Sequence, residues 1–117
     1  FLWMLGDPGR LSPQAAAAIQ NPERSVFVSA VTAVEIAIKR RLGKLEAPEG
    51  LDAEIASRGL LELPLKFRHG ERLLTLSDHH QDPFDRMLIA QAMEEDLTLI
   101  THDRKMEPYG GIKILWS

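Results

Sequence analysis

Acidic residues flank a predicted helix in the second half of the chain. Asp82 and Asp85 lie at the beginning of this helix, and Asp103 follows a short apolar run that predicts a buried strand. Carboxylates that are brought together repel one another unless a divalent cation lies between them. The pattern therefore favours metal-dependent chemistry, provided that the fold gathers these acids in one place.

A further candidate acid, Glu35, lies on a second predicted helix. Apolar residues form a face on either side of it, and Glu35 shares a narrow polar stripe with Thr32 and Lys39. An acid in this position needs water, a partner or a metal ion. Glu35 and Lys39 are also spaced for an i, i+4 ion pair, which is worth only about 0.3 to 0.5 kcal/mol when exposed. Both interpretations stay open from the sequence.

The other acids have structural interpretations as well. Asp82 precedes Pro83 and is best explained as a helix N-cap, with Arg86 at i+4 as an ion-pair partner. Asp85, in the first helical turn, suits the helix dipole, and Asp103 is an ordinary loop residue after a strand. Taken singly, none of these residues identifies a catalytic site.

Basic residues lie near the candidate acids. Lys39 and Arg40 fall at a predicted helix C-terminus, and Arg104 comes directly after Asp103. These cations suit RNA phosphates, although a helix C-terminus favours positive charge whatever the function. His79 and His80 suggest a transition-metal site, but no further ligands at suitable spacing complete it, and we interpret them as loop residues.

The elements that carry these residues alternate between strands and helices, which predicts an α/β fold with a mostly parallel sheet covered by helices. Asp103 then lies outside the carboxyl end of a strand, where such folds place their functional groups. The predicted helices are one that starts at Ser12, then Ala30–Leu42, Leu51–Arg58, Leu65–Leu74 and Pro83–Glu95; the predicted strands are Ser25–Val28, Leu60–Leu63, Thr98–Thr101 and Ile112–Leu115.

The composition bounds the class of protein. With 117 residues, 44% hydrophobic and 26% charged, the chain predicts one globular domain with its own core. It has no cysteine, which excludes disulfides, a thiol nucleophile and Cys-ligated zinc, and is compatible with a cytoplasmic location. No apolar run is long enough for a membrane span. The net charge of −3 does not by itself indicate nucleic-acid binding.

An ordered set of motifs resembles PIN-domain proteins of the VapC toxin type. The resemblance covers essentially the whole chain, and no single motif carries it. The motifs are Val28-Ser29-Ala30, Glu35-Ile36-Ala37-Ile38-Lys39, Leu42-Gly43-Lys44-Leu45, Asp82-Pro83-Phe84-Asp85-Arg86-Met87-Leu88-Ile89-Ala90-Gln91-Ala92 and Thr101-His102-Asp103.

The resemblance implies a three-layer α/β/α fold and an endoribonuclease that uses Mg²⁺ or Mn²⁺. It also implies a cognate antitoxin protein and a toxin homodimer. Glu35, Asp85 and Asp103 match three acids of the family's site, and Thr101 matches a hydroxyl residue beside the last of them, with Asp82 in support. Lys39, Arg40 and Arg104 are candidates for RNA binding.

The family's fourth acid has no match in this sequence. In relatives it ends a central first strand, shortly before the position of Leu2 and Trp3, so we expect residues 1–117 to form a single PIN-like domain that lacks this strand. Its loss would leave neighbouring strands without partners. If the protein begins at Phe1, the alternative is a non-catalytic module that binds an antitoxin or itself. A phosphatase on a similar sheet is a more distant alternative.

Overall fold

The computed structural model describes residues 2–5, 25–43, 59–77, 82–101 and 104–116, together with residues 13, 17, 20, 21, 23, 56 and 57. The helices predicted from Ser12 and over Leu51–Arg58 fall largely outside these residues, as do His79 and His80. Within them lie the strands β1 (Leu2–Leu5), β2 (Ser25–Ser29), β3 (Leu61–Leu63), β4 (Thr98–Thr101) and β5 (Lys113–Trp116).

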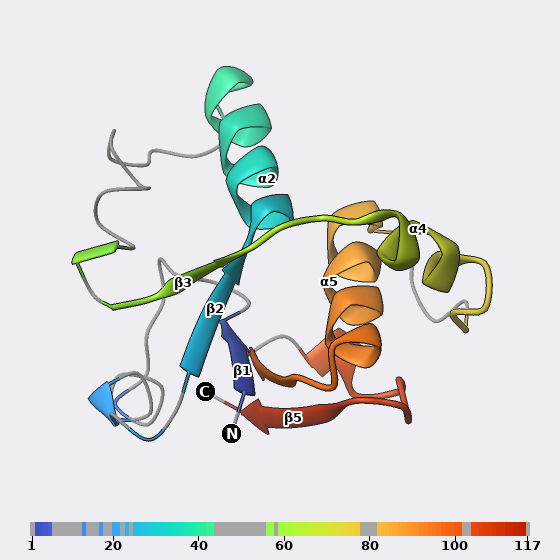
Figure 1. Ribbon diagram of the computed structural model, residues 1–117. Helices are drawn as coiled ribbons and strands as arrows, with labels where there is room; N and C mark the ends of the chain where they lie inside the picture. Colours follow the sequence, from blue (N-terminus) through green and yellow to red (C-terminus); the bar gives the residue numbers. More distant parts are fainter. Residues whose placement is uncertain are drawn as a thin grey trace.

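The strands form one sheet in the order β3-β2-β1-β4-β5, and every neighbouring pair is parallel. This arrangement confirms the predicted α/β class (Figure 1). Because all strands run the same way, their carboxyl ends meet at a single edge of the sheet. Ser29, Leu63 and Thr101 end their strands at this edge.

The centre of the sheet holds β1, for which the sequence analysis predicts no strand. Met4 pairs with Phe27 on one side and Leu99 on the other, and its side chain is completely buried. A wholly apolar run suits a strand with neighbours on both sides. The pairing gives β2 and β4 a partner at this position, so the unpaired ladder groups expected there do not occur. That a family strand lies upstream of Phe1 stays a prediction.

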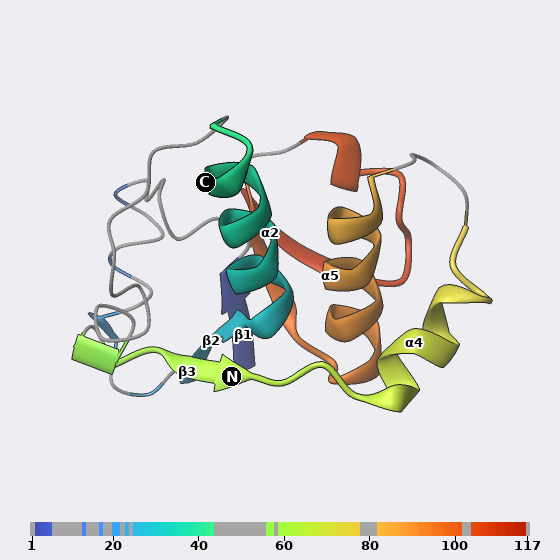
Figure 2. The same ribbon diagram turned by 90° about the horizontal axis from the view of Figure 1, so that it is seen from above.

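Three α-helices lie in the described part of the chain: α2 (Ala30–Arg41), α4 (Phe67–Leu73) and α5 (Pro83–Glu94). Both views show α2 and α5 side by side, with α4 crossing near α5 (Figures 1 and 2). The local signals act as predicted, because Ser29 caps α2, Gly43 follows it with a φ of 71°, and Pro83 opens α5. None of the described helices is long and apolar enough to span a membrane.

The predicted boundaries agree with the observed elements to within two residues. Among the described elements, the strand β1 and a single-turn 3-10 helix, η1 (Arg104–Met106), have no predicted counterpart. The core lies between α5 and the sheet, where Met4, Leu88, Ile89 and Leu99 are at most 2% exposed. The apolar face of the acid-bearing helix α5 is therefore fixed against the sheet.

A buried histidine joins α4 to the end of α5. The Nδ1 atom of His69 accepts the Lys66 backbone N–H at 2.9 Å, which leaves the proton on Nε2, and Nε2 lies 2.9 Å from Oε1 of Glu95. Arg68 Nε donates to the same carboxylate oxygen at 3.0 Å. Burial, the largest influence, opposes ionisation of Glu95, but the hydrogen bonds from His69 and Arg68 outweigh it and hold its pKa below the ordinary 4.5.

We predict that Glu95→Gln lowers the free energy of unfolding at pH 7 by about 0.5 to 1 kcal/mol, since the amide loses the charge-assisted contacts with His69 and Arg68. Because the folded-state pKa of Glu95 is depressed, its contribution is complete above pH 4.5 and is lost as the pH falls below that value. Urea unfolding at pH 7 and pH 3 measures both effects. A gap between wild type and variant that widens in acid would contradict this assignment.

Candidate functional site

The helices that carry Glu35 and Asp85 run in opposite directions side by side. In Figure 1, α2 (teal) rises beyond the carboxyl end of β2, and α5 (orange) stands next to it. The beginning of α2 contacts the second half of α5, because Ser29, the N-cap of α2, donates to Gln91. The later turns of α2 therefore face the first turn of α5, which carries Asp85.

One buried hydrogen bond fixes this arrangement. The Ser29 hydroxyl donates to Oε1 of Gln91, and the Gln91 amide donates to the Pro64 carbonyl at 3.3 Å. Ser29 also caps α2 by accepting the Val31 N–H at 3.0 Å. Gln91 is fully buried, so its polar atoms depend on these partners. A single side chain thus ties α5 to β2, to α2 and to the chain that leaves β3.

Lys39 lies among the acids of the two helices. Its Nζ is 2.6 Å from Oε2 of Glu35, so the structure contains the i, i+4 ion pair. The hydrogen bond to Glu35 raises the pKa of Lys39; burial opposes this increase, and the negative charges of Glu35, Asp82 and Asp85 add to it. Lys39 is therefore paired with Glu35, and the charges of Asp82 and Asp85 act on its ammonium as well.

Asp82 caps α5 as predicted. Its Oδ1 accepts the backbone N–H groups of Phe84 at 2.9 Å and Asp85 at 3.2 Å. The Arg86 guanidinium donates to the Ser77 carbonyl at 3.1 Å, a contact with the preceding loop that the sequence did not indicate. Asp82 thus has a structural role, and Asp85 lies half-buried in the first turn of α5.

The carboxyl end of β4 supplies the remaining candidates. Thr101 ends this strand and is 6% exposed. Asp103 lies outside the described residues, so its predicted place in the site stays a prediction. Arg104 stacks over the Trp116 ring at 4.1 Å from the ring centroid, a cation–π contact that holds its guanidinium beside β5. Arg40 is exposed near the end of α2.

The sequence matches the PIN domain family over residues 1–111. The chain belongs to the PIN-domain family. A search of curated proteins gives no match.

Solved structures with the same fold accompany this match. A VapBC2 structure from Rickettsia felis, bound to a promoter DNA fragment, has a TM-score of 0.74 at 14% identity, covering 100% of this chain and 99% of that one. VapBC from Salmonella typhimurium, also bound to DNA, gives 0.72 at 20% identity, with 98% of each chain covered. VapBC-5 from Mycobacterium tuberculosis has a TM-score of 0.66 at 18% identity, and the match covers 99% of this chain and 98% of that one. At these identities the likeness establishes the fold.

The donor chemistry of this PIN domain suits a hard cation. Carboxylates and hydroxyls are the oxygen ligands that Mg²⁺ prefers. Thr32, one turn before Glu35 on the same face, is 3% exposed, and its hydroxyl has no hydrogen-bond partner within the described residues. No three His, Asp or Glu side chains in the described ranges are arranged to hold a metal ion. The described residues fit part of a coordination shell.

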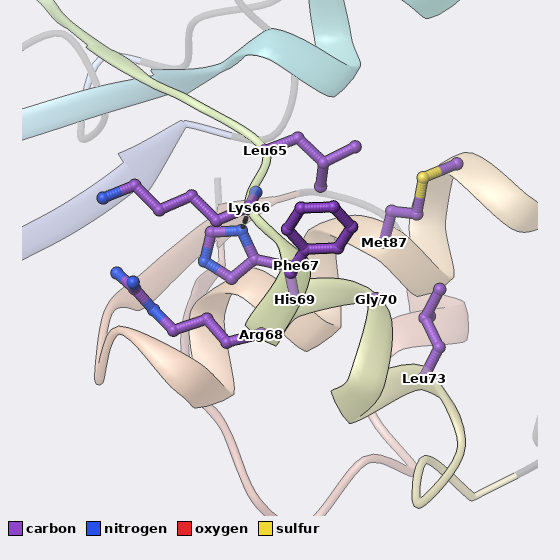
Figure 3. A pocket seen from close by; sticks show the side chains of 8 residues that line it. All are labelled: Leu65, Lys66, Phe67, Arg68, His69, Gly70, Leu73 and Met87. Carbon is purple, nitrogen blue, oxygen red and sulfur yellow. Dashed lines mark hydrogen bonds between the residues drawn. The ribbon is translucent and has the colours of Figure 1, made fainter.

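An apolar hollow lies apart from the acids, on α4 (Figure 3). It has a volume of about 730 Å³, and Leu65, Phe67, Leu73 and Met87 line it together with the basic residues Lys66 and Arg68. Phe67 is 96% exposed, and none of the described residues that line the hollow is a carboxylate. Its composition is that of a surface for protein contact and does not suit a metal.

Sequence reasoning missed Gln91 and Ser29 as the residues that position the acids. It saw Ser29 only as a cap and Gln91 only as part of a motif. A signal was present, because Gln91 is polar yet falls within the apolar run of α5. A glutamine there needs a buried partner from another element.

We predict that Gln91→Ala lowers the free energy of unfolding by about 2 to 4 kcal/mol, since it leaves a cavity and deprives Ser29 and the Pro64 carbonyl of their partner. Thermal and urea denaturation measure this loss. The matched control is Gln20→Ala, at an exposed position, which should change stability by less than about 0.5 kcal/mol. Equal stability of the two variants would show that the buried contact does not hold the helices.

Proposed function

We propose that this PIN domain is a metal-dependent endoribonuclease and acts as the toxin of a toxin–antitoxin pair. The observation that carries the proposal is the packing of α2, which carries Glu35, beside α5, which carries Asp85 in its first turn, on a parallel sheet. Both positions match acids of the family's motifs. The three similar structures are VapBC proteins, and the one from Mycobacterium tuberculosis is a member of the VapBC family of toxin–antitoxin systems, which supports an antitoxin partner for this chain.

The residues divide the chemistry between them. Asp85 would hold Mg²⁺ or Mn²⁺, and Glu35 and Asp103 would hold further metal or the attacking water. When bound, the metal makes a coordinated water more acidic and stabilises charge on the phosphate oxygens. The carboxylates orient the attacking water by accepting its hydrogens. Thr101 at the end of β4 and Asp82 at the cap of α5 keep the neighbouring backbone in place.

The basic residues near the carboxyl edge of the sheet would bind the RNA substrate. Arg104, steadied on Trp116, and Arg40 near the end of α2 offer charge to the phosphates of an RNA strand. The positive charges are local, on a chain whose net charge is −3. We therefore expect RNA binding that weakens steeply as salt is added.

A module that only binds protein is the second candidate, and the exposed apolar surface of α4 favours it. Leu65, Phe67 and Leu74 are 49%, 96% and 89% exposed. Side chains of this kind are seldom left together in water unless a partner covers them. Both an antitoxin and a second copy of the chain are partners that the family resemblance implies.

We predict that Asp85→Asn abolishes Mg²⁺-dependent cleavage of RNA by the full-length protein, with a loss of at least roughly a hundredfold. The amide keeps the shape of the side chain but removes the charge that a metal needs. Cleavage of a labelled RNA is measured with Mg²⁺ or Mn²⁺, and circular dichroism checks the fold.

The control is Asp96→Asn, the same change at the exposed residue after α5, where asparagine tolerates the φ of 52°. It should cleave like wild type. Cleavage by Asp85→Asn at the wild-type rate would overturn the role of Asp85, and a wild-type protein that binds its partner without cleaving RNA would favour the second candidate.

A further inference from the structure

Lys39 occupies a position that the proposed chemistry does not explain. Its ammonium is 2.6 Å from the carboxylate of Glu35, and the charges of Asp82 and Asp85 act on it as well. The side chain of Glu35 is only 17% exposed, whereas that of Lys39 is 46% exposed. Lys39 therefore reaches from solvent to Glu35 and neutralises the charge of this carboxylate.

This contact conflicts with metal binding at Glu35. A carboxylate oxygen that donates its electrons to a divalent cation cannot keep a strong hydrogen bond to an ammonium on the same side, and the two cations repel each other. Lysine carries its charge on a flexible four-carbon stem with three rotatable donors. Since nearly half of the Lys39 side chain is exposed, its ammonium can leave Glu35 without disturbing the backbone of α2.

An RNA strand would offer the displaced ammonium a new partner. A phosphate that approaches the acid cluster brings negative charge to the place where Lys39 lies, and a lysine pairs with phosphate as a point charge. Arg40 and Arg41 add further positive charge in the last turn of α2.

We propose that Lys39 is a positioning residue for the RNA that exchanges partners during binding. It pairs with Glu35 in the metal-free protein, and it passes to an RNA phosphate when the metal ion takes the Glu35 carboxylate. This inference rests on the proposed ribonuclease function. It also predicts how Lys39 changes the affinity of the protein for the metal ion and for RNA, and both affinities can be measured without RNA cleavage.

The test compares the full-length wild type with Lys39→Met, which keeps the aliphatic stem and removes the charge, and Lys39→Arg, which keeps the charge. Mn²⁺ titrations without RNA should show roughly two- to fivefold tighter binding for Lys39→Met, because the competing cation is gone. Binding of a single-stranded RNA oligonucleotide with Ca²⁺ should weaken, and its log–log salt slope should become shallower by about 0.7, the contribution of one phosphate contact. Lys39→Arg should retain the slope.

The matched control is Lys113→Met. Lys113 is exposed at the start of β5, at the edge of the sheet opposite to the acids, so its loss removes the same charge without changing either affinity. Unchanged or weaker Mn²⁺ binding by Lys39→Met, or an RNA salt slope equal to that of wild type, would overturn the role of Lys39. If the wild type binds Mn²⁺ and RNA but does not cleave RNA, the proposed ribonuclease activity is refuted, and the Mn²⁺ and RNA affinities of Lys39→Met still test the role of Lys39. A wild type that binds neither would refute both.

Discussion

The buried hydrogen bond between Ser29 and Gln91 is the contact on which the candidate site depends. Ser29 ends β2, caps α2 and donates to Gln91, so one residue sets the direction of the helix that carries Glu35 and its distance from the helix that carries Asp85. A buried amide is costly to leave without partners, and this cost disfavours any other packing of α5 against the sheet. Glu35 and Asp85 lie on different helices, so the separation of these helices depends on the hydrogen bond between Ser29 and Gln91.

The electrostatics of the site follow from that packing. The negative charges of Asp85 in the first turn of α5 and Glu35 in the middle of α2 repel one another. Lys39, on the same helix as Glu35, forms an ion pair with Glu35. This pairing lowers the repulsion between Glu35 and the acids of α5.

Local signals predicted most of the fold. Ser29, Gly43 and Pro83 act through their own backbone geometry, so the boundaries of α2 and α5 could be read from neighbouring residues alone. The strand β1 could not, because a run that is apolar on both faces has no period, and only its pairing with β2 and β4 makes it a strand. The same limit applies to Gln91, whose role depends on residues far away in the sequence. Asp103 lies outside the described residues, so this part of the site rests on the motif.

The central place of β1 bears on how the chain acquires its structure. Trp3 pairs with Thr98, and Leu2 pairs with Ser25, so the middle of the sheet joins segments from both ends of the sequence. Contacts between distant segments form slowly, since the chain must close long loops before it gains from them. During synthesis, the apolar strand leaves the ribosome long before β4 exists to cover its second edge. Until then β1 is an exposed apolar segment that is prone to aggregation. A chaperone or an early partner that shields it would raise the yield of folded protein.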